Sequence, residues 1–165
     1  MKFKKIIFIT LFLSMKLYGL EVQYFISPFF YHNPQTYSLN GLQYYNFNTG
    51  KLIDSAIYKS GLKYFKCSAS HNTDVLIYIY PKTFYNPLMT TLYTDLNVRV
   101  YINNGQNINN FLVQHQNNVY LNEYSENQFE EHYLGLLTKL DKELILFNKN
   151  NITTKINGSL CNLFL

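Results

Sequence analysis

The sequence predicts one α+β domain in which an antiparallel sheet of about four strands carries two helices on one face. Two observations predict this class: one segment alternates its side chains at strand spacing, and two segments repeat apolar side chains at helical spacing. The expected order of elements is strand, helix, three strands, helix. The length of 165 residues fits one domain, and an apolar fraction of 47% suffices for a folded core.

Residues 21–31 predict the first strand, because aromatic and β-branched residues are abundant there. Pro28 interrupts this segment, since proline has no N–H to donate to a strand ladder. Residues 39–47 have the composition of a further short strand. The start of the domain is therefore expected to be mainly extended.

The first helix is predicted to begin at a cap formed by Asn48 or Thr49 and to end near Gly61, because apolar residues recur at helical spacing in between. Residues 74–80 are apolar or aromatic on both faces, which predicts a central strand. Residues 81–89 contain two of the four prolines and are expected to connect this strand to the next one.

The clearest alternation covers residues 92–102, where mainly aliphatic side chains alternate with polar or tyrosine side chains. This pattern predicts a half-buried strand. The dipeptide Asn104-Gly105 follows, and it tolerates the positive φ of a tight hairpin turn. Residues 111–121 are therefore expected to return as the antiparallel partner.

The second helix is predicted to begin at Ser125, which forms a capping-box pattern with Gln128. Its apolar stripe follows at steps of three and four, and consists of Phe129, Tyr133, Leu136, Leu137, Leu140, Leu144 and Phe147. Such a stripe is typical of a helix that packs on a sheet. Residues 160–165 are expected to add a short terminal strand.

Residues 1–19 are expected to form a bacterial Sec signal peptide. Three lysines within the first five residues precede an apolar run over 6–15, which is too short for a bilayer that needs about 20 residues. An amphipathic first helix is the alternative, although the apolar residues cover every face. Whether the signal is removed stays open, because Lys16 is an awkward neighbour for cleavage at Gly19. Residues 20–165 are thus expected to be one periplasmic or secreted domain.

The formal net charge of +4 does not predict a nucleic-acid partner. Four of the fourteen basic residues lie among the first twenty residues, whereas all ten acidic residues lie at Glu21 or beyond. The exported part is formally neutral and lacks the basic stripe that neutralises phosphates. We expect no transmembrane span in it, and peripheral membrane association stays open.

Cys67 and Cys161 are expected to form a disulfide. Two thiols in an oxidising compartment pair more often than thiols in the cytosol. The bridge would tie the carboxy-terminal tail to the strand that holds Cys67. The alternative is two separate buried thiols.

No pattern for catalysis or for a cofactor is present in the sequence. The seven glycines form neither a phosphate-binding loop nor a nucleophile elbow, so we expect no cofactor. The histidines are far apart in the sequence and are interpreted as surface or loop side chains, with His115 in phase with the apolar side of its strand; they are His32, His71, His115 and His132. We predict no catalytic residue and no metal ligand.

Phe84, Tyr85 and Asn86 form the candidate binding loop. Tyrosine beside amides suits the recognition of sugars, peptides or proteins, because its ring offers a large stacking area with a polar tip. Loops between strands present such side chains to solvent. The competing interpretation is compositional, since a genome rich in A and T uses Asn, Lys, Ile, Tyr and Phe heavily.

These patterns resemble those of small envelope lipoproteins of Gram-negative bacteria, of the YajG type and of the auxiliary lipoproteins of ABC transport systems. The resemblance covers about 52–147 and rests on residues 74–80, on the alternating strand before Asn104-Gly105 and on the closing amphipathic helix. It implies two helices on one face of an antiparallel sheet. Gly19, Leu20 and Glu21 occupy the zone where those proteins carry an acylated cysteine, so no lipid attachment is expected.

We therefore expect a non-enzymatic exported protein that binds a protein of the cell envelope, as an accessory component of a periplasmic or outer-membrane assembly. The alternative is a small hydrolase or carbohydrate-active enzyme, which needs two carboxylates, such as Asp74, Asp95 or Glu131, in a cleft at a separation of about 5–10 Å. A pilus or adhesin subunit completed by strand exchange is a third hypothesis, and it needs a groove where a strand is missing.

Overall fold

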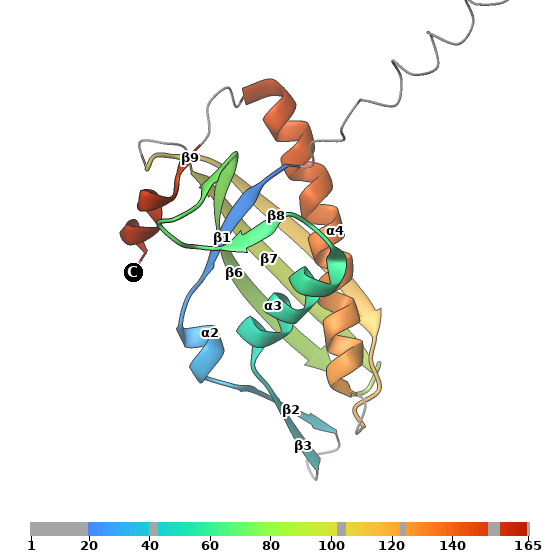
Figure 1. The fold of residues 1–165 in the computed structure, drawn as a ribbon. Coiled ribbons are helices and arrows are strands. Elements are labelled where there is room, and N and C mark those ends of the chain that lie inside the picture. Colours follow the sequence, from blue (N-terminus) through green and yellow to red (C-terminus); the bar gives the residue numbers. More distant parts are fainter. Residues whose placement is uncertain (1–19, 40–42, 102–104, 123–124, 152–155, 165) are drawn as a thin grey trace, which may run out of the picture.

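The computed structural model describes residues 20–39, 43–101, 105–122, 125–151 and 156–164 (Figure 1). A five-stranded sheet with the order β4-β1-β6-β7-β8 forms its centre. The strands are β1 (Val22–Ile26), β4 (Tyr64–Lys66), β6 (Val75–Asn86), β7 (Thr91–Tyr101) and β8 (Asn107–Asn118). The predicted signal segment 1–19 lies outside the described residues.

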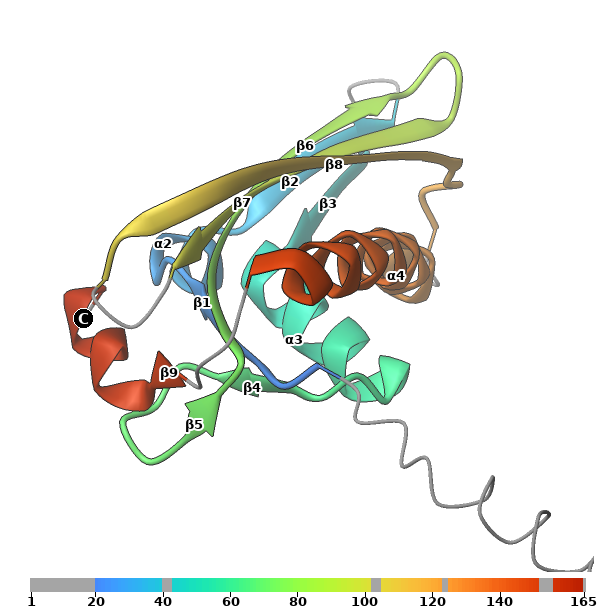
Figure 2. The ribbon, with the colours of Figure 1, turned by 90° about the horizontal axis from the view of Figure 1, so that it is seen from above.

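Two helices, α3 (Thr49–Ser60) and α4 (Ser125–Asn151), cover one face of the sheet, as Figure 2 shows. The predicted α+β class and the packing of both helices on one face are confirmed. The predicted sheet is wrong in two respects, because it has five strands and is mixed. Val22 of β1 lies opposite Tyr64 of β4 and opposite Val75 of β6, and both pairings are parallel.

The parallel strands arise from crossover connections, which the pattern of any one sequence segment cannot predict. The chain leaves β1, passes through α3 and returns in the same direction as β4. It then crosses back to the other side of β1 and enters β6. Parallel strands need such long connections, whereas an alternation pattern only reports which side chains are buried.

Strands β6, β7 and β8 form an antiparallel meander. The segment 81–89 is not a connection as predicted, because β6 continues through Pro81 as far as Asn86. β6 pairs with β1 only up to Ile79. Beyond that residue no neighbouring strand of the sheet accepts a backbone N–H on this edge of β6, so Pro81, which has no N–H, fits there. The tight turn lies at 87–90, where Thr90 has a φ of 49°. β8 is the predicted partner strand, although it begins before Phe111.

Shorter elements close the ends of the sheet. The hairpin β2 (Gln35–Leu39) and β3 (Gln43–Phe47) occupies most of the region predicted as one strand. Pro28 ends the first strand and precedes the short helix α2 (Phe29–His32). β5 (Asn72–Thr73) pairs with β9 (Ile156–Asn157), and the tail forms the 3-10 helix η1 (Gly158–Leu163) where we predicted a terminal strand.

Both helix boundaries agree with the sequence patterns, but neither N-terminal cap forms as predicted. Asn48 is the N-cap residue of α3, yet its side chain makes no capping hydrogen bond. Gly61 ends α3 with a φ of 68°, as the prediction requires. α4 begins at Ser125, but Gln128 does not complete the expected capping box. Its side chain instead accepts a hydrogen bond from Tyr120 N at 3.0 Å and donates one to Tyr120 O at 3.2 Å. It therefore fixes the strand-to-helix connection.

The hydrophobic core fills the space between the helices and the sheet. The stripe of α4 is buried from Phe129 to Leu144, and it contacts aliphatic side chains of β1, β6 and β7. The two helices are joined at Glu130, which accepts hydrogen bonds from Ser55 and Lys59 of α3. One face of the sheet is thus fixed by packing and by a buried carboxylate.

Candidate functional site

The predicted binding loop is not a loop, because all three residues belong to β6. The Tyr85 ring is buried, and its hydroxyl donates to the Val119 carbonyl at 3.0 Å. Asn86 Oδ1 accepts hydrogen bonds from the backbone N–H of Leu88 at 3.0 Å and thereby shapes the turn. Phe84 alone has its side chain in solvent, with 63% of its surface exposed. The alternation of a strand explains why neighbours differ in this way.

Phe84 belongs to a larger surface, which we call the open face. This surface consists of side chains of β6, β7 and β8 that point away from α3 and α4: Tyr78, Tyr80, Lys82, Phe84, Tyr93, Asp95, Asn97, Arg99, Asn110, Leu112 and Gln114. Figure 2 shows that α3 and α4 lie on the other side of these strands. The exposed fractions are 41% for Tyr80 and 57% for Leu112.

The open face is ordered by cross-strand pairs. Tyr78 lies opposite Arg99, and Lys82 lies opposite Asp95. Gln114 of β8 donates a hydrogen bond to Asp95 Oδ1 at 2.9 Å. Side chains at such directly opposed positions support one another, so the surface is held in place by the strands that carry it.

A shallow hollow of about 710 Å³ lies on the open face. Its lining includes the rings of Tyr78 and Tyr80, the amides of Asn97 and Asn110, and the cationic side chains of Lys82 and Arg99. Burial and the neighbouring Tyr80 raise the pKa of Tyr78, while Arg99 acts in the opposite direction. The hollow therefore offers aromatic area, hydrogen-bonding amides and positive charge.

The three carboxylates of the enzyme hypothesis do not converge. Asp95 lies on the open face, whereas Glu131 is exposed on α4 on the other side of the sheet. Asp74 precedes β6 and accepts a hydrogen bond from Glu21 N at 2.9 Å. Asp95 lies opposite Lys82, eight positions along the strand from Asp74, which corresponds to about 26 Å. These residues form no pair of catalytic carboxylates.

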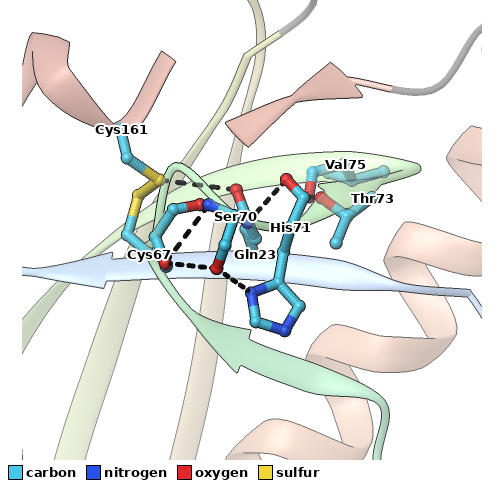
Figure 3. Close-up of a disulfide and its surroundings, with 8 residues drawn as sticks. Gln23, Cys67, Ser70, His71, Thr73, Val75 and Cys161 are labelled. Carbon is cyan, nitrogen blue, oxygen red and sulfur yellow. Dashed lines mark hydrogen bonds between the residues drawn. A yellow bond between two sulfur atoms is a disulfide. The ribbon is translucent and has the colours of Figure 1, made fainter. Parts of the chain in front are cut away.

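The carboxy-terminal tail is attached by a disulfide between Cys67 and Cys161, whose Cα atoms are 5.5 Å apart (Figure 3). Gln23 of β1 is buried next to the bridge and donates hydrogen bonds to Ser68 O at 2.9 Å and to His71 O at 3.1 Å. Its Oε1 lies 3.4 Å from Cys161 Sγ. The buried amide thus shapes the segment that follows Cys67.

The attached tail covers one end of the sheet face that α3 and α4 leave free. Cys161 packs against Leu76, a buried side chain of β6 on this face. Phe164 stacks on Phe25 and Tyr78, with ring centroids 5.2 and 5.8 Å apart. Tyr78 therefore belongs both to this aromatic cluster and to the open face, which continues from Tyr78 toward Phe84.

Two histidines lie in the helix–sheet interface, which corrects their interpretation as surface side chains. His115 of β8 stacks on His132 of α4 at 4.8 Å between centroids, and its predicted inward direction agrees with this contact. His132 is fully buried, and neither ring nitrogen has a hydrogen-bond partner. Burial, with the charges of His115 and Lys139, lowers the pKa of His132 to about 3. Gly135 permits this contact, because a Cβ there would lie 3.0 Å from His115 Nε2.

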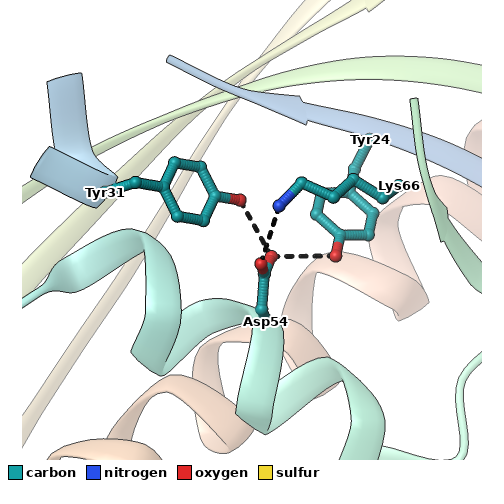
Figure 4. Close-up of polar contacts among 4 residues, drawn as sticks. All are labelled: Tyr24, Tyr31, Asp54 and Lys66. Carbon is teal, nitrogen blue, oxygen red and sulfur yellow. Dashed lines mark hydrogen bonds and ion pairs between the residues drawn. The ribbon is translucent and has the colours of Figure 1, made fainter. Parts of the chain in front are cut away.

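A polar cluster that no sequence pattern indicated forms around Asp54 of α3 (Figure 4). Its Oδ1 accepts hydrogen bonds from Tyr24 and Tyr31, both at 2.9 Å, and its Oδ2 pairs with Lys66 Nζ at 3.0 Å. Burial, followed by the Asp54 charge, raises the pKa of both tyrosines. Four elements meet here, and their residues lie too far apart in the sequence to form a motif.

The described residues contain no group of three or more His, Cys, Asp or Glu side chains that could hold a metal ion. A search of their helices likewise finds none that combines the length and the apolar character of a membrane span.

No protein-family model and no curated protein matches the sequence. Among solved structures, a crystal structure of an uncharacterized protein matches with a TM-score of 0.48 and 12% identity, over 76% of this chain and 90% of that chain. A second structure, described as a "putative lipoprotein" from Caulobacter crescentus, matches with a TM-score of 0.41 and 10% identity, over 62% of this chain and 84% of that chain. At these TM-scores the matches carry no argument about function, which has to come from the surfaces described above.

Proposed function

We propose that this chain is a non-enzymatic exported protein of the cell envelope that binds another protein through its open face. The observation that carries the proposal is the exposure of aromatic and aliphatic side chains on the antiparallel meander β6–β7–β8. Phe84 and Leu112 are both more than half exposed, and Tyr80 lies between them and the tail cluster. Exposed apolar patches of this kind mark protein interaction sites.

The charges of the open face favour a partner segment that carries an acidic side chain. Arg99 and Lys82 are the charged residues that line the hollow. Asp95 lies on the same face opposite Lys82, but it does not line the hollow. Arg and Tyr are enriched in the centres of protein interfaces, where an arginine fork pairs with a carboxylate.

Support for export comes from the sequence and from the bridge. The predicted signal precedes a formally neutral domain, and a disulfide is typical of proteins that work outside the cytosol. The basic start and the apolar run of segment 1–19 are typical of an export signal, and the disulfide fits an oxidising compartment outside the cytosol.

The strand-exchange hypothesis has less support. The order of the five strands contains no interior gap among the described residues. One edge of β6 is unpaired by β1 beyond Ile79, but Pro81 in that stretch has no N–H to donate to an added strand. β8 is an edge strand, but Lys139 Nζ already donates to its Gln114 carbonyl at 3.0 Å. A lysine placed at an edge strand hinders the addition of another strand.

Photo-crosslinking tests the proposal in intact cells that express the protein. p-Benzoylphenylalanine replaces Phe84 on the open face or, as the matched control, Tyr58 on α3, which is 89% exposed. We expect a discrete adduct of higher mass from position 84 and none of that mass from position 58. Arg99→Glu should abolish the adduct, whereas Lys51→Glu on α3 should leave it unchanged. Equal adducts from both positions, or no adduct from either, would overturn the proposal.

A further inference from the structure

A second concave site lies at the carboxy-terminal ends of the parallel strands β1 and β4, and it shares no lining residue with the hollow on the open face. Its cavity has a volume of about 520 Å³, within the range of about 300–1,000 Å³ that is typical of small-molecule sites. Phe25, Ile26 and Pro28 form its apolar wall. Lys51 and Lys66 also line it.

The topology places this cavity where open sheets bind ligands. The connection from β1 to β4 passes through α3 on the helical side of the sheet. The connection from β4 to β6 begins with Cys67, which packs with Leu76 on the other side. β1 therefore lies at a point where successive connections leave on opposite faces, and ligands bind at the carboxyl ends of strands at such points.

The Asp54 cluster fixes one wall of the cavity. The Tyr31 ring packs against Gly50, where an added Cβ would lie 2.9 Å from a ring atom, and its hydroxyl is held by Asp54. Lys66 Nζ lies 4.1 Å from the centroid of the same ring. The wall is thus preformed, so that a ligand does not have to order these side chains.

The charge of the cavity is positive. Asp54 offsets the charge of Lys66, since the two form an ion pair. Lys51 has no ion pair among the described residues, so its charge is not offset. An apolar wall next to an uncompensated ammonium group favours a ligand that is apolar at one end and anionic at the other.

We propose that this cavity binds a small amphipathic anion, with its apolar body against Phe25, Ile26 and Pro28 and its anionic group next to Lys51 and Lys66. The site and the proposed protein-binding function stand independently, because the two surfaces use different residues. Loss of the open-face partner leaves this site intact, and the reverse also holds.

Two dyes with the same aromatic body test the proposal on the purified protein by fluorescence titration. 8-Anilinonaphthalene-1-sulfonate is anionic, and N-phenyl-1-naphthylamine is neutral. We expect the sulfonate to bind with one-to-one stoichiometry. Lys51→Gln should weaken its binding roughly 3–10-fold, the effect of one partly screened charge, and should leave the neutral dye unaffected. Lys142→Gln removes the same charge from α4 and is the matched control.

A second variant is expected to change the affinity for the sulfonate in the opposite direction. Asp54→Asn keeps the shape of the side chain and an acceptor for the tyrosines, but it leaves Lys66 without its counter-charge. We expect it to tighten binding of the sulfonate by roughly 3–10-fold. Amide chemical shifts should move at Ile26 and Lys66 rather than in β7 and β8.

Each alternative outcome would overturn the proposal. Equal effects of Lys51→Gln and Lys142→Gln would show that the affinity for the dye depends only on the net charge of the protein. Weaker binding to Asp54→Asn would contradict the assigned charge of the cavity. Shifts confined to the open face would assign the dye to that surface instead.

Discussion

The two faces of the five-stranded sheet differ in what covers them and in what their side chains do. On the covered face, aliphatic side chains of β6 and β7 pack against α3 and α4, and residues such as Ile77 and Leu136 are fully buried. On the open face, Tyr80, Phe84 and Leu112 of the same strands and their neighbour β8 are exposed. Alternating side chains of the same strands therefore form the core on one side and, on the other, the exposed surface that we propose for association.

The largest expected effect concerns the disulfide that holds the carboxy-terminal tail over one end of the sheet face that α3 and α4 leave free. Replacing both Cys67 and Cys161 by Ser should lower the free energy of unfolding by about 4–5 kcal/mol, because the bridge constrains a separation of 94 residues in the unfolded chain. Urea denaturation with and without reductant measures it. Two free thiols in the unfolded, non-reduced protein, or equal stability of both forms, would contradict the bridge.

A matched pair of truncations then compares the two faces directly. Leu136→Ala removes a fully buried side chain of α4 and should cost about 3 kcal/mol, through lost apolar burial and the cavity left behind. Leu112→Ala removes the same atoms from the open face and should change stability by less than about 0.5 kcal/mol. Similar urea midpoints for the two variants would show that the open face is covered in solution.

The buried histidine makes the stability of the covered face depend on pH. The folded chain keeps His132 neutral down to a pKa of about 3, whereas the unfolded chain protonates it near its ordinary value of 6.5. Its contribution is therefore complete above pH 6.5 and is lost as the pH falls, by up to about 1.4 kcal/mol per pH unit.

His132→Leu should flatten the pH dependence of the unfolding free energy between pH 6 and 4 by about one proton. His32→Gln, which changes an exposed histidine outside the interface, is the control. Parallel curves for His132→Leu and the unmodified protein would contradict the burial of this ring.

A smaller effect is expected at the Tyr31 contact. Gly50→Ala places a Cβ 2.9 Å from the Tyr31 ring, so that the ring has to shift away from α3. We expect a loss of about 1–3 kcal/mol from overpacking, measured by urea denaturation. Unchanged stability together with an unchanged near-ultraviolet circular dichroism spectrum would show that the ring does not pack there.

Local patterns predicted the helices and the meander. α3 ends at Gly61 and α4 begins at Ser125, because caps and apolar stripes are properties of neighbouring residues. The parallel pairing of β1 with β4 and β6 was missed, since it joins segments that lie far apart along the chain. Pro81 predicts the end of a strand, and only the pairing of β1 shows that one edge of β6 is free there.

The candidate site was predicted less well, and for the same reason. Phe84 was found, but its exposure comes from strand alternation and not from a loop. The residues of the open face can be identified only from the register of β6, β7 and β8, and no local sequence pattern predicts that register. The burial of His132 could have been inferred, because it follows Phe129 by three positions and so lies on the apolar stripe of α4. The Asp54 cluster had no such signal.

One matched comparison tests the central claim most directly. Tyr80→Ser with Leu112→Ser alters the open face, and Tyr58→Ser with Leu146→Ser alters exposed residues of α3 and α4. For each double variant, the urea midpoint and the yield of the adduct formed from position 84 are measured. We predict that both keep the midpoint of the unmodified protein and that only the open-face variant loses the adduct. Equal loss of the adduct in both variants, or its retention in the open-face variant, would contradict the assignment of association to this face.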